Sequence, residues 1–544
     1  MRFFAFLSAF AITLGITSPG LGYRTLWADE LETAERARSI VESGLPKIFD
    51  SAGNLSVSSA GKEIEEGPLH RYTPWLQFYV GAAGIEFGRR FGLASDTGVR
   101  LPFIILHAAT SGLIARGLVA GLSIGALPAI GIATLYGLGS VRLIHARTAR
   151  YHALTDFLFI AAWIVFGKIR RRRRLSPGAS ASAGMTVLLG VILIALLHTQ
   201  TLVGILGASI FSLLFFIEER VSKRTLLLAL LVLVGVGTLF LLVRPWEQSA
   251  IWGAVAYRRG RGLKSWFEID YALFFGIASF LFVSGFRELP HPADGWRKEA
   301  ALFVAYLAVV FIGIRVLDLH PYSQVRYYIP VVGPLLFWPL ALGGPTFAAS
   351  ARARTTFLLG FVLAFVVAEF SSQEMPPFQG LRIVAFDSSS GKKDQPLREA
   401  FTIIEKSGSD ASGVLMEYVP QAVNWYLPRF RPALIPDPTT LSSLGKKNPS
   451  LPAMVAPEWN LTFQSRLGFW ACDANCDYHR IGDPGSDDRY FVESKTLGKK
   501  IAFCVISRWE TYQWNNAPFM EYLPSALTPE GDPREKLILA RRCP

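Results

Sequence analysis

The sequence predicts a polytopic bundle of transmembrane α-helices followed by a soluble α/β domain. Of the 544 residues, 51% are hydrophobic and only 18% are charged, whereas a soluble protein carries about a quarter charged residues. The charges lie between apolar runs, many of which approach the roughly 20 residues that a helix needs to cross a bilayer. Residues 371–544 are instead polar and rich in Pro, Trp and Tyr. We therefore expect about 11–13 spans in a transmembrane domain, residues 1–370, and a soluble domain in residues 371–544.

The net charge of the chain is +13. In a soluble domain, such an excess of Lys and Arg would indicate binding to nucleic acid. In a membrane protein these residues set the topology instead, and no zinc finger, RNA-binding signature or phosphate-binding glycine loop accompanies them. We therefore expect membrane lipids, and no nucleic acid, among the partners.

The expected spans follow one another from the N-terminus. Residues 2–22 form a signal anchor, because Arg2 supplies a positive flank and no clear cleavage site is followed by a soluble mature domain. A polar loop, residues 23–72, follows this span. Further spans are expected near 74–88, 101–138 (one or two crossings), 153–167, 184–199, 201–217, 225–243, 271–286, 300–316, 329–349 and 356–370.

The positively charged loops orient these spans. The basic run 168–174 falls between two spans, where cytoplasmic anchoring is expected. Three other basic segments fall on the same, cytoplasmic side as this run when the expected spans are counted: 218–224, 287–298 and 350–354. The loop 23–72 and the C-terminal domain then lie on the extracytoplasmic side of a bacterial inner membrane. This arrangement requires 101–138 to cross an odd number of times, although its length and glycine content suggest a hairpin. We give the basic run more weight.

The first loop contains a predicted helix. From Glu30 to Ser43, apolar residues recur at helical spacing against acidic and basic ones. Asp29 can cap its start, and Gly44 followed by Pro46 ends it. Such a helix is expected to lie along the membrane surface.

The C-terminal region is expected to form a small mixed α/β domain without a catalytic motif. Its predicted elements are helices at 397–406 and 420–427 and strands at 413–418 and 501–506. The four cysteines all lie there: Cys472, Cys476, Cys504 and Cys543. An even set outside the membrane favours disulfides in an oxidising compartment, with free thiols and a metal site as the alternatives. Asn460-Leu-Thr462 is an N-glycosylation sequon, as is Asn54-Leu-Ser56.

Two adjacent acids, Asp29 and Glu30, follow the first span by only a few residues. Acidic residues also favour the start of a helix, so a purely structural role is the alternative. Carboxylates this close to a bilayer suggest a general base at its outer face.

Basic residues gather in the loops expected on that same side. Their position contradicts the topology rule, so we expect another function, and guanidinium groups match the oxygens of a phosphate. Snorkelling or pairing with acids is the alternative. The loop before span 153–167 carries Arg142, His145, Arg147, Arg150, His152 and Asp156, and 315–330 carries Arg315, His320, Tyr322, Arg326 and Tyr327. His70 and Arg71 stand at the mouth of the second span.

These residues imply a reaction in which an acceptor hydroxyl displaces a lipid phosphate from a sugar. The acceptor must lose a proton, which an Asp can take. The leaving phosphate must be stabilised as its charge develops, which Arg and His can do. The spans can bury the polyprenyl tail of the donor.

Several motifs resemble a known family. They are Trp27-Ala-Asp29-Glu30 after the first span, Tyr72-Thr-Pro74 before the second, Gly98-Val-Arg100-Leu-Pro102, Arg147-Thr-Ala-Arg150-Tyr-His152 and Arg326-Tyr-Tyr-Ile-Pro330. Together they resemble the integral-membrane glycosyltransferases with the C-type fold, and within them the protein O-mannosyltransferase and aminoarabinose transferase group. The resemblance covers roughly residues 1–370.

The resemblance implies roles for individual residues. Asp29 would be the catalytic base, and Glu30 a supporting acid or acceptor contact. The donor phosphate would be held by Arg147, Arg150, His152, Arg326 and Tyr327, and His70, Arg71 and Asp156 would contact substrate. In the stretch that matches Arg147–His152, the family often has an Asp soon after the Arg, whereas here Tyr151 and His152 follow and Asp156 is the nearest acid. Asp156 or His152 would take that role.

The resemblance also implies the substrates. The donor would be a polyprenyl-phosphate hexose or pentose, and the acceptor an envelope glycan, lipid or protein. Adjacent carboxylates suit Mg or Mn, so a divalent cation stays open at Asp29 and Glu30, although we expect no cofactor or metal to be required.

Two other classes compete with the enzyme hypothesis. A transporter or flippase of lipid-linked sugars would need ionisable residues within spans and internal repeats, for which Glu86 and His107 are the only signals. A receptor would use its C-terminal domain to bind envelope glycans.

Overall fold

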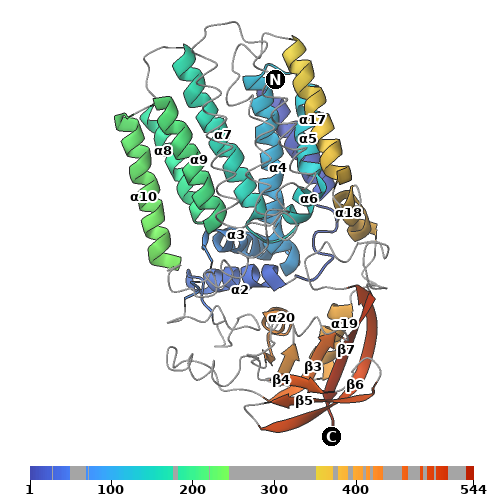
Figure 1. Cartoon of the computed structure of the whole chain (residues 1–544). Coiled ribbons are helices and arrows are strands. Elements are labelled where there is room, and N and C mark those ends of the chain that lie inside the picture. The colour runs from blue at the N-terminus through green and yellow to red at the C-terminus, as the bar shows by residue number, and fades with distance from the viewer. Residues whose placement is uncertain are drawn as a thin grey trace, which may run out of the picture. The chain divides into compact units, whose positions relative to one another are not determined.

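The structure is a computed structural model of the whole chain (Figure 1). It describes residues 1–26, 28–48, 69–71, 73–175, 182–219, 221–243, 351–371, 378–389, 396–407, 412–416, 421–432, 456–463, 478–481, 487–494, 498–512 and 534–544. The spans expected between 271 and 349, the basic segment 287–298 and the sequon at Asn54 therefore lie outside the described residues.

The chain divides into two compact units. Unit 1 comprises Met1–Pro19, Thr73–Gln77 and Phe103–Val384, and unit 2 comprises Gly20–Tyr72, Phe78–Pro102 and Ala385–Pro544. The expected boundary at residue 370 separates a transmembrane part from a soluble part. The two units are defined by their internal contacts and do not test that boundary, which stays a prediction.

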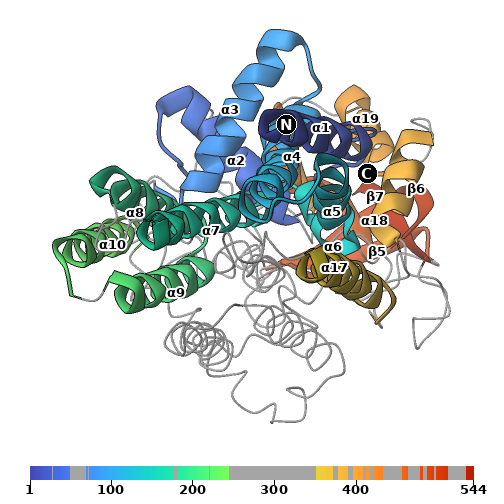
Figure 2. The ribbon, with the colours of Figure 1, turned by 90° about the horizontal axis from the view of Figure 1, so that it is seen from above.

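Unit 1 is helical. Its described elements are α1 (Arg2–Thr17), most of α4 (Ser95–Gly121), α5 (Ala126–Leu138), α6 (Ser140–Ala146), α7 (His152–Leu175), α8 (Ala183–Leu197), α9 (Thr201–Glu219), α10 (Lys223–Val243), α17 (Ala351–Ser371) and the start of α18 (Gln379–Ser389). Figure 2 looks along this bundle: α8, α9 and α10 group beside α7, and α17 lies against α5. A core of small and branched side chains joins α1, α4 and α5, including Ala5, Ala9, Ala115 and Ala133.

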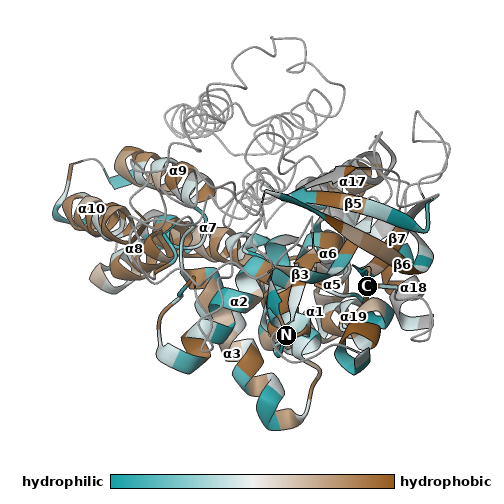
Figure 3. Cartoon of the chain, turned by 90° about the horizontal axis from the view of Figure 1, so that it is seen from below, coloured by the Kyte–Doolittle hydropathy of each residue, from teal (hydrophilic) through white to brown (hydrophobic). Residues whose placement is uncertain are grey.

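Among the described helices, three are long and apolar enough to cross a membrane: Ser95–Gly121, His152–Arg172 and Lys223–Val243. Shorter apolar helices are Arg2–Thr17, Ala126–Leu138 and Ala183–Leu197. In α10, Leu226, Leu233 and Leu241 are each more than 60% exposed, and Figure 3 shows the hydrophobic colouring of this helix and its neighbour α8. Contiguous exposed apolar surface is unfavourable in water, so these helices have the composition that a lipid environment requires.

The basic segments in unit 1 meet at one end of the bundle. Arg171 Nη1 donates to the carbonyl of Ala120 at 2.8 Å, and Arg354 Nη1 to that of Ser123 at 3.3 Å. Both acceptor carbonyls lie at the end of α4 or in the short segment between α4 and α5. With 24 residues, α7 is about 36 Å long, so His152 at its start lies at the opposite end. The sequence analysis placed 168–174 and 350–354 on one side of the membrane; the structure brings both segments to the same end of the helical bundle, and their side of a membrane stays a prediction.

The second expected span needs correction. Residues 76–91 form a helix, α3 (Leu76–Phe91), but it carries Glu86, Arg89 and Arg90, whose side chains pair with one another at the surface. Most of this helix belongs to unit 2. Its hydrophobic residues gave it the length of a span, whereas its charges give it the composition of a surface helix.

This correction removes the conflict over 101–138. The region holds two helices, α4 and α5, joined by residues 122–125 and packed together in one core. It is the hairpin that length and glycine content suggested. If α3 does not cross and α4 and α5 cross separately, the number of crossings before the basic run 168–174 stays even. The cytoplasmic position of that run remains a prediction.

Unit 2 contains α2 (Ala28–Ser43), most of α3, the first residues of α4, and the C-terminal elements. The latter are α19 (Pro396–Ser407), β1 (Gly413–Met416), α20 (Gln421–Tyr426), β2 (Arg431–Pro432), β3 (Pro457–Phe463), β4 (Tyr478–Ile481), β5 (Arg489–Ser494), β6 (Lys499–Tyr512) and β7 (Arg534–Arg542). The described strands form one sheet in the order β2-β1-β3-β7-β6-β5-β4. β1 runs parallel to β2 and β3, and the other pairs are antiparallel. The four elements predicted in this domain are confirmed.

The two helices at the start of unit 2 cross closely. A Cβ on Gly84 would lie 2.4 Å from the carbonyl oxygen of Gly98 and 2.6 Å from Pro102 Cδ. Only glycine at position 84 permits this approach. The crossing places the first turns of α4 beside α3, which fixes the position of Asp96 and Arg100 in unit 2.

In the sheet, burial alternates along β5, where Tyr490 and Val492 point into the core with Phe503 and Leu415. Cys504 on β6 forms a disulfide with Cys543, which follows β7. The predicted use of disulfides is confirmed for this pair, while Cys472 and Cys476 lie outside the described residues. Asn460 is fully buried in β3 and its Oδ1 accepts from Tyr490 Oη at 2.7 Å, so this sequon is inaccessible in the folded domain.

Candidate functional site

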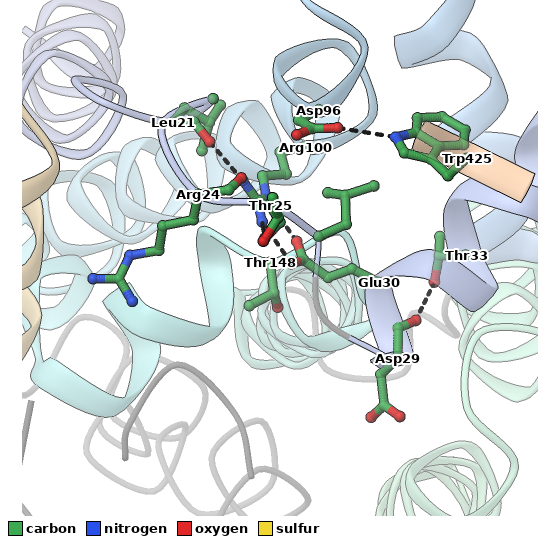
Figure 4. A network of polar contacts seen from close by, with 12 residues as sticks. Leu21, Arg24, Thr25, Asp29, Glu30, Thr33, Asp96, Arg100, Thr148 and Trp425 are labelled. Carbon is green, nitrogen blue, oxygen red and sulfur yellow. Dashed lines mark hydrogen bonds and ion pairs between the residues drawn. The ribbon is translucent and has the colours of Figure 1, made fainter. Parts of the chain in front are cut away.

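Asp29 and Glu30 occupy the first turn of α2. The predicted helix is confirmed, and it ends at Gly44, whose φ of +77° is the left-handed conformation that favours glycine at a helix end. Successive helical side chains point about 100° apart. The carboxylate of Asp29 therefore points away from Glu30 and is partly exposed, as Figure 4 shows, whereas Glu30 is 1% exposed.

Glu30 is held by Arg100, from the second turn of α4. Arg100 Nε donates to Glu30 Oε1 at 2.7 Å and Nη2 donates to Oε2 at 2.6 Å. The two parallel bonds form the bidentate pair that a guanidinium makes with a carboxylate. Both side chains are buried.

The remaining donors of Arg100 bind the loop between α1 and α2. Nη1 donates to the carbonyls of Leu21 and Arg24 at 2.9 and 2.8 Å, and Nη2 to that of Thr25 at 3.1 Å. All five N–H groups of the guanidinium are thus used. Arg100 ties the loop, α2 and α4 together and fixes the start of the helix that presents Asp29.

His70 packs against α2 in the same unit. Its Nε2 lies 3.3 Å from Glu32 Oε1, and its ring meets Phe78 edge-on at 5.2 Å. The backbone N–H of His70 donates to the carbonyl of Pro46 at 2.8 Å. The structure encloses His70 completely, while Arg71 beside it is partly exposed. His70 therefore joins the loop after α2 to the helix that carries Asp29.

A second group of predicted site residues lies in unit 1, around the start of α7. His145, Arg147, Arg150 and His152 are all buried. The rings of His145 and His152 are in contact, with centroids 4.3 Å apart and planes tilted by 45°. The guanidinium of Arg150 lies 5.4 Å from the ring centroid of Tyr151. Two imidazoles and a guanidinium in one cluster can bind an anion.

Arg147 has a structural partner in this cluster. Its Nη1 donates to the carbonyls of Thr17 and Pro19 at 2.6 and 2.8 Å. These carbonyls end α1, where a positive charge is favourable. Arg147 thus caps α1, and the roles of Arg147 and Arg150 at the donor phosphate stay predictions.

Asp156 lies one turn further along α7. It is buried, and its Oδ1 accepts from Tyr136 Oη at 2.8 Å. The guanidinium of Arg142 lies 4.0 Å above the Tyr136 ring. Asp156 therefore links α7 to α5, a contact that its predicted role with substrate did not include.

The structure groups the predicted residues in two sets. Asp29, Glu30, His70 and Arg71 belong to unit 2, and Arg147, Arg150, His152 and Asp156 belong to unit 1. Arg326 and Tyr327 lie outside the described residues. In the described part of the chain, no three His, Cys, Asp or Glu side chains are grouped so that they could hold a metal ion.

Sequence reasoning did not assign site roles to Arg100 or Asp96. Arg100 stands within a helix of apolar composition, and an ionisable residue in such a helix is itself a signal of a specific partner. The resemblance to an Arg-Leu-Pro stretch identified the motif that contains Arg100 but did not indicate that Arg100 pairs with Glu30.

The two signals of a transporter lie in different surroundings. His107 is buried in α4, with Nε2 2.9 Å from the carbonyl oxygen of Gly137. Glu86 lies at the surface of α3, where hydrogen bonds from Arg90 and Arg89 lower the pKa of its carboxyl. Glu86 is therefore no mid-span carboxylate.

No family model matches the sequence, and no curated protein matches it significantly. Among solved structures, the chain is similar to ArnT from Cupriavidus metallidurans bound to undecaprenyl phosphate, with TM-score 0.47, 15% identity and coverage of 88% of this chain and 96% of that chain. It is also similar to the oligosaccharyltransferase of Archaeoglobus fulgidus in complex with Zn and sulfate, with TM-score 0.48, 13% identity and coverage of 92% and 74%. The same archaeal enzyme with an inhibitory peptide and a dolichol-phosphate gives a TM-score of 0.39 at 13% identity, with coverage of 91% and 74%.

Proposed function

We propose that this protein is a membrane glycosyltransferase that moves a sugar from a polyprenyl-phosphate donor to a hydroxyl of an extracytoplasmic acceptor. One observation carries the proposal. In a chain with helices long and apolar enough to cross a membrane, a partly exposed acid, Asp29, is fixed at the start of α2 by the buried Glu30–Arg100 pair. The motifs that resemble the C-type-fold glycosyltransferases support it.

In the proposed reaction, Asp29 accepts the proton of the acceptor hydroxyl. The acceptor oxygen forms a bond to the anomeric carbon of the sugar as the bond from that carbon to the phosphate oxygen breaks. The electron pair of the broken bond leaves with the polyprenyl phosphate. Arg150 and His152 are assigned to that phosphate, because cationic donors stabilise the charge that develops on it.

Glu30 is assigned a positioning role in place of acceptor contact. Both of its carboxylate oxygens accept from Arg100 in a buried pair. A carboxylate committed in this way holds its helix in place, and its neighbour Asp29 is the acid that remains at the surface.

The test is transfer by purified protein. Full-length protein is incubated with radiolabelled polyprenyl-phosphate sugars, hexose and pentose, and membrane extract as acceptor, and release of label from the lipid is measured. We expect Asp29→Asn to lower the rate by about 10²–10⁴-fold, the usual contribution of a general base. The control is Glu42→Gln, an exposed acid at the other end of the same helix, which should transfer normally.

Full activity in a folded Asp29→Asn protein would contradict the role of the base. A wild-type protein that leaves every labelled lipid intact, but carries it across a vesicle membrane, would favour the transporter instead.

A further inference from the structure

We propose that Tyr426 and Trp425, in the C-terminal domain, are positioning residues for the transfer reaction, because they hold the loop that presents Asp29. The inference rests on the proposed function for the role of Asp29. It assigns the C-terminal domain a part in catalysis, although that domain carries no catalytic motif of its own.

The connection runs through Asp96, a buried carboxylate in the first turn of α4. It accepts from Arg398 Nη2 at 2.6 Å, from Trp425 Nε1 at 2.9 Å and from Tyr426 Oη at 3.0 Å. These donors come from α19 and α20 of the C-terminal domain. Three donors on one buried carboxylate form a specific junction, because each loses its partner if the segments part.

Asp96 lies one helical turn before Arg100. Residues four apart share one face of a helix, so the turn that binds the C-terminal domain through Asp96 also binds Glu30 through Arg100. The start of α4 is thus fixed from both sides, by the C-terminal domain and by the helix of the proposed base.

Tyr426 also reaches the loop directly. Its hydroxyl donates to Asp96 and accepts from the backbone N–H of Leu26 at 2.7 Å. Leu26 precedes Asp29 by three residues. Burial raises the pKa of the Tyr426 hydroxyl well above its usual value, and the Asp96 carboxylate raises it further. The hydroxyl therefore stays protonated and keeps donating throughout the physiological pH range.

Two further contacts hold the same loop and helix. Arg398 Nη2 donates to the carbonyl of Gly22 at 3.1 Å, and Arg38 Nη1 on α2 donates to the carbonyl of Asn424 at 3.1 Å. The guanidinium of Arg38 also lies 5.4 Å from the centre of a Trp425 ring. The C-terminal domain thus binds both the loop before Asp29 and the helix after it.

Loss of the Tyr426 hydroxyl should affect the chemical step. Displacing a catalytic group by about 1 Å can cost on the order of 100-fold in rate. Tyr426→Phe keeps the ring that stacks on Phe401, yet removes the partner of Leu26 and one donor to Asp96. We expect kcat to fall by about 10-fold to 100-fold, with the KM for the lipid donor unchanged.

The matched control is Tyr490→Phe. Tyr490 is a buried tyrosine of the same C-terminal domain, and its hydroxyl donates to Asn460 within the sheet. The control removes one buried hydrogen bond without touching the loop, so its cost is confined to stability. Trp425→Phe is the second test variant, because it removes the indole donor to Asp96 while keeping an aromatic ring beside Arg38, and it serves if Tyr426→Phe fails to fold.

The experiment measures kcat, KM and hydrogen exchange of the backbone amides of residues 20–30 in the full-length proteins. We expect Tyr426→Phe and Trp425→Phe to lower kcat and to speed exchange in that segment, with Tyr490→Phe matching wild type in both. Wild-type exchange and kcat in the folded Tyr426→Phe and Trp425→Phe variants would overturn the inference, as would an equal fall of kcat in Tyr490→Phe. Absence of transfer by wild type would defeat the proposed function alone, and hydrogen exchange would still decide whether Tyr426 holds the loop.

Discussion

Two of the buried Arg–Glu pairs in the described part of the chain are alike in chemistry and different in the segments that they join. Arg100 and Glu30 in unit 2 form a bidentate pair, and the other donors of Arg100 bind three carbonyls of one loop. Arg170 and Glu218 in unit 1 join α7 to α9 at the arginine-rich end of the bundle, with Arg170 Nε 3.1 Å from Glu218 Oε2. The first pair shapes the backbone beside a proposed catalytic base, whereas the second pair fastens two helices.

The difference shows that burial of an ion pair does not by itself indicate a site. Separating either pair leaves one charge buried without its partner, which is costly wherever it occurs. Arg100 also donates to three main-chain carbonyls of the loop between α1 and α2, so this one side chain contributes several of the contacts that fix the conformation of the loop.

The largest expected effect comes from removing each arginine's charge. Arg100→Gln and Arg170→Gln should each lower the free energy of unfolding by about 3–5 kcal/mol, because Glu30 or Glu218 stays buried with its charged partner removed. Transfer per folded molecule should be lost only in Arg100→Gln. Thermal stability in detergent and radiolabel transfer measure the two quantities, and normal transfer by folded Arg100→Gln would break the comparison.

Substitution by lysine, which keeps the positive charge, should have a smaller effect on transfer and should still distinguish Arg100 from Arg170. Lysine has three donors where arginine has five, and its ammonium cannot pair in a bidentate manner. Arg100→Lys should therefore keep Glu30 paired but release loop carbonyls, and transfer should fall by about tenfold. Arg170→Lys should transfer like wild type. Equal transfer by both lysine variants would mean that the loop holds its conformation without Arg100.

The smallest expected effect comes from an exposed ion pair in unit 2, Arg541–Glu458, which can be compared with the two buried pairs. Hydrogen bonds from Ser412 and then Arg541 lower the pKa of the Glu458 carboxyl. A lowered pKa means that the pair stabilises the fold above the unfolded pKa of the carboxyl and that this contribution is lost as the pH falls through the folded pKa. Because exposed pairs contribute little, Glu458→Gln should slightly flatten the acid side of the stability profile measured by thermal unfolding. If the stability of Glu458→Gln varies with pH as that of wild type does, the Glu458–Arg541 pair contributes no measurable stability.

The sequence allowed prediction where a local pattern decides structure. Helical spacing, Asp29 at the start and Gly44 at the end correctly predicted α2. The elements α19, β1, α20 and β6 followed from similar patterns. The candidate residues in the first loop and before α7 were named from their chemistry, and their roles stay proposals.

Other features were beyond any local pattern. Hydrophobicity alone made α3 resemble a span, although its charged residues pair at the surface. Glu30 and Asp29 are adjacent acids with the same local surroundings in the sequence, yet one is buried on Arg100 and the other is partly exposed. The contact that decides this joins residues 70 positions apart.

By itself, the sequence determined where α2 begins and ends and which loops are basic, because these properties depend on residues within a few positions of one another. Only the tertiary structure decided that all five N–H groups of Arg100 donate to Glu30 and to the loop. The same holds for the hydrogen bond from the Leu26 N–H to the Tyr426 hydroxyl, which joins residues 400 positions apart in the sequence. The physical reason is that the partner of a buried charge or hydroxyl is set by which segments pack together, and that packing is a property of the whole chain.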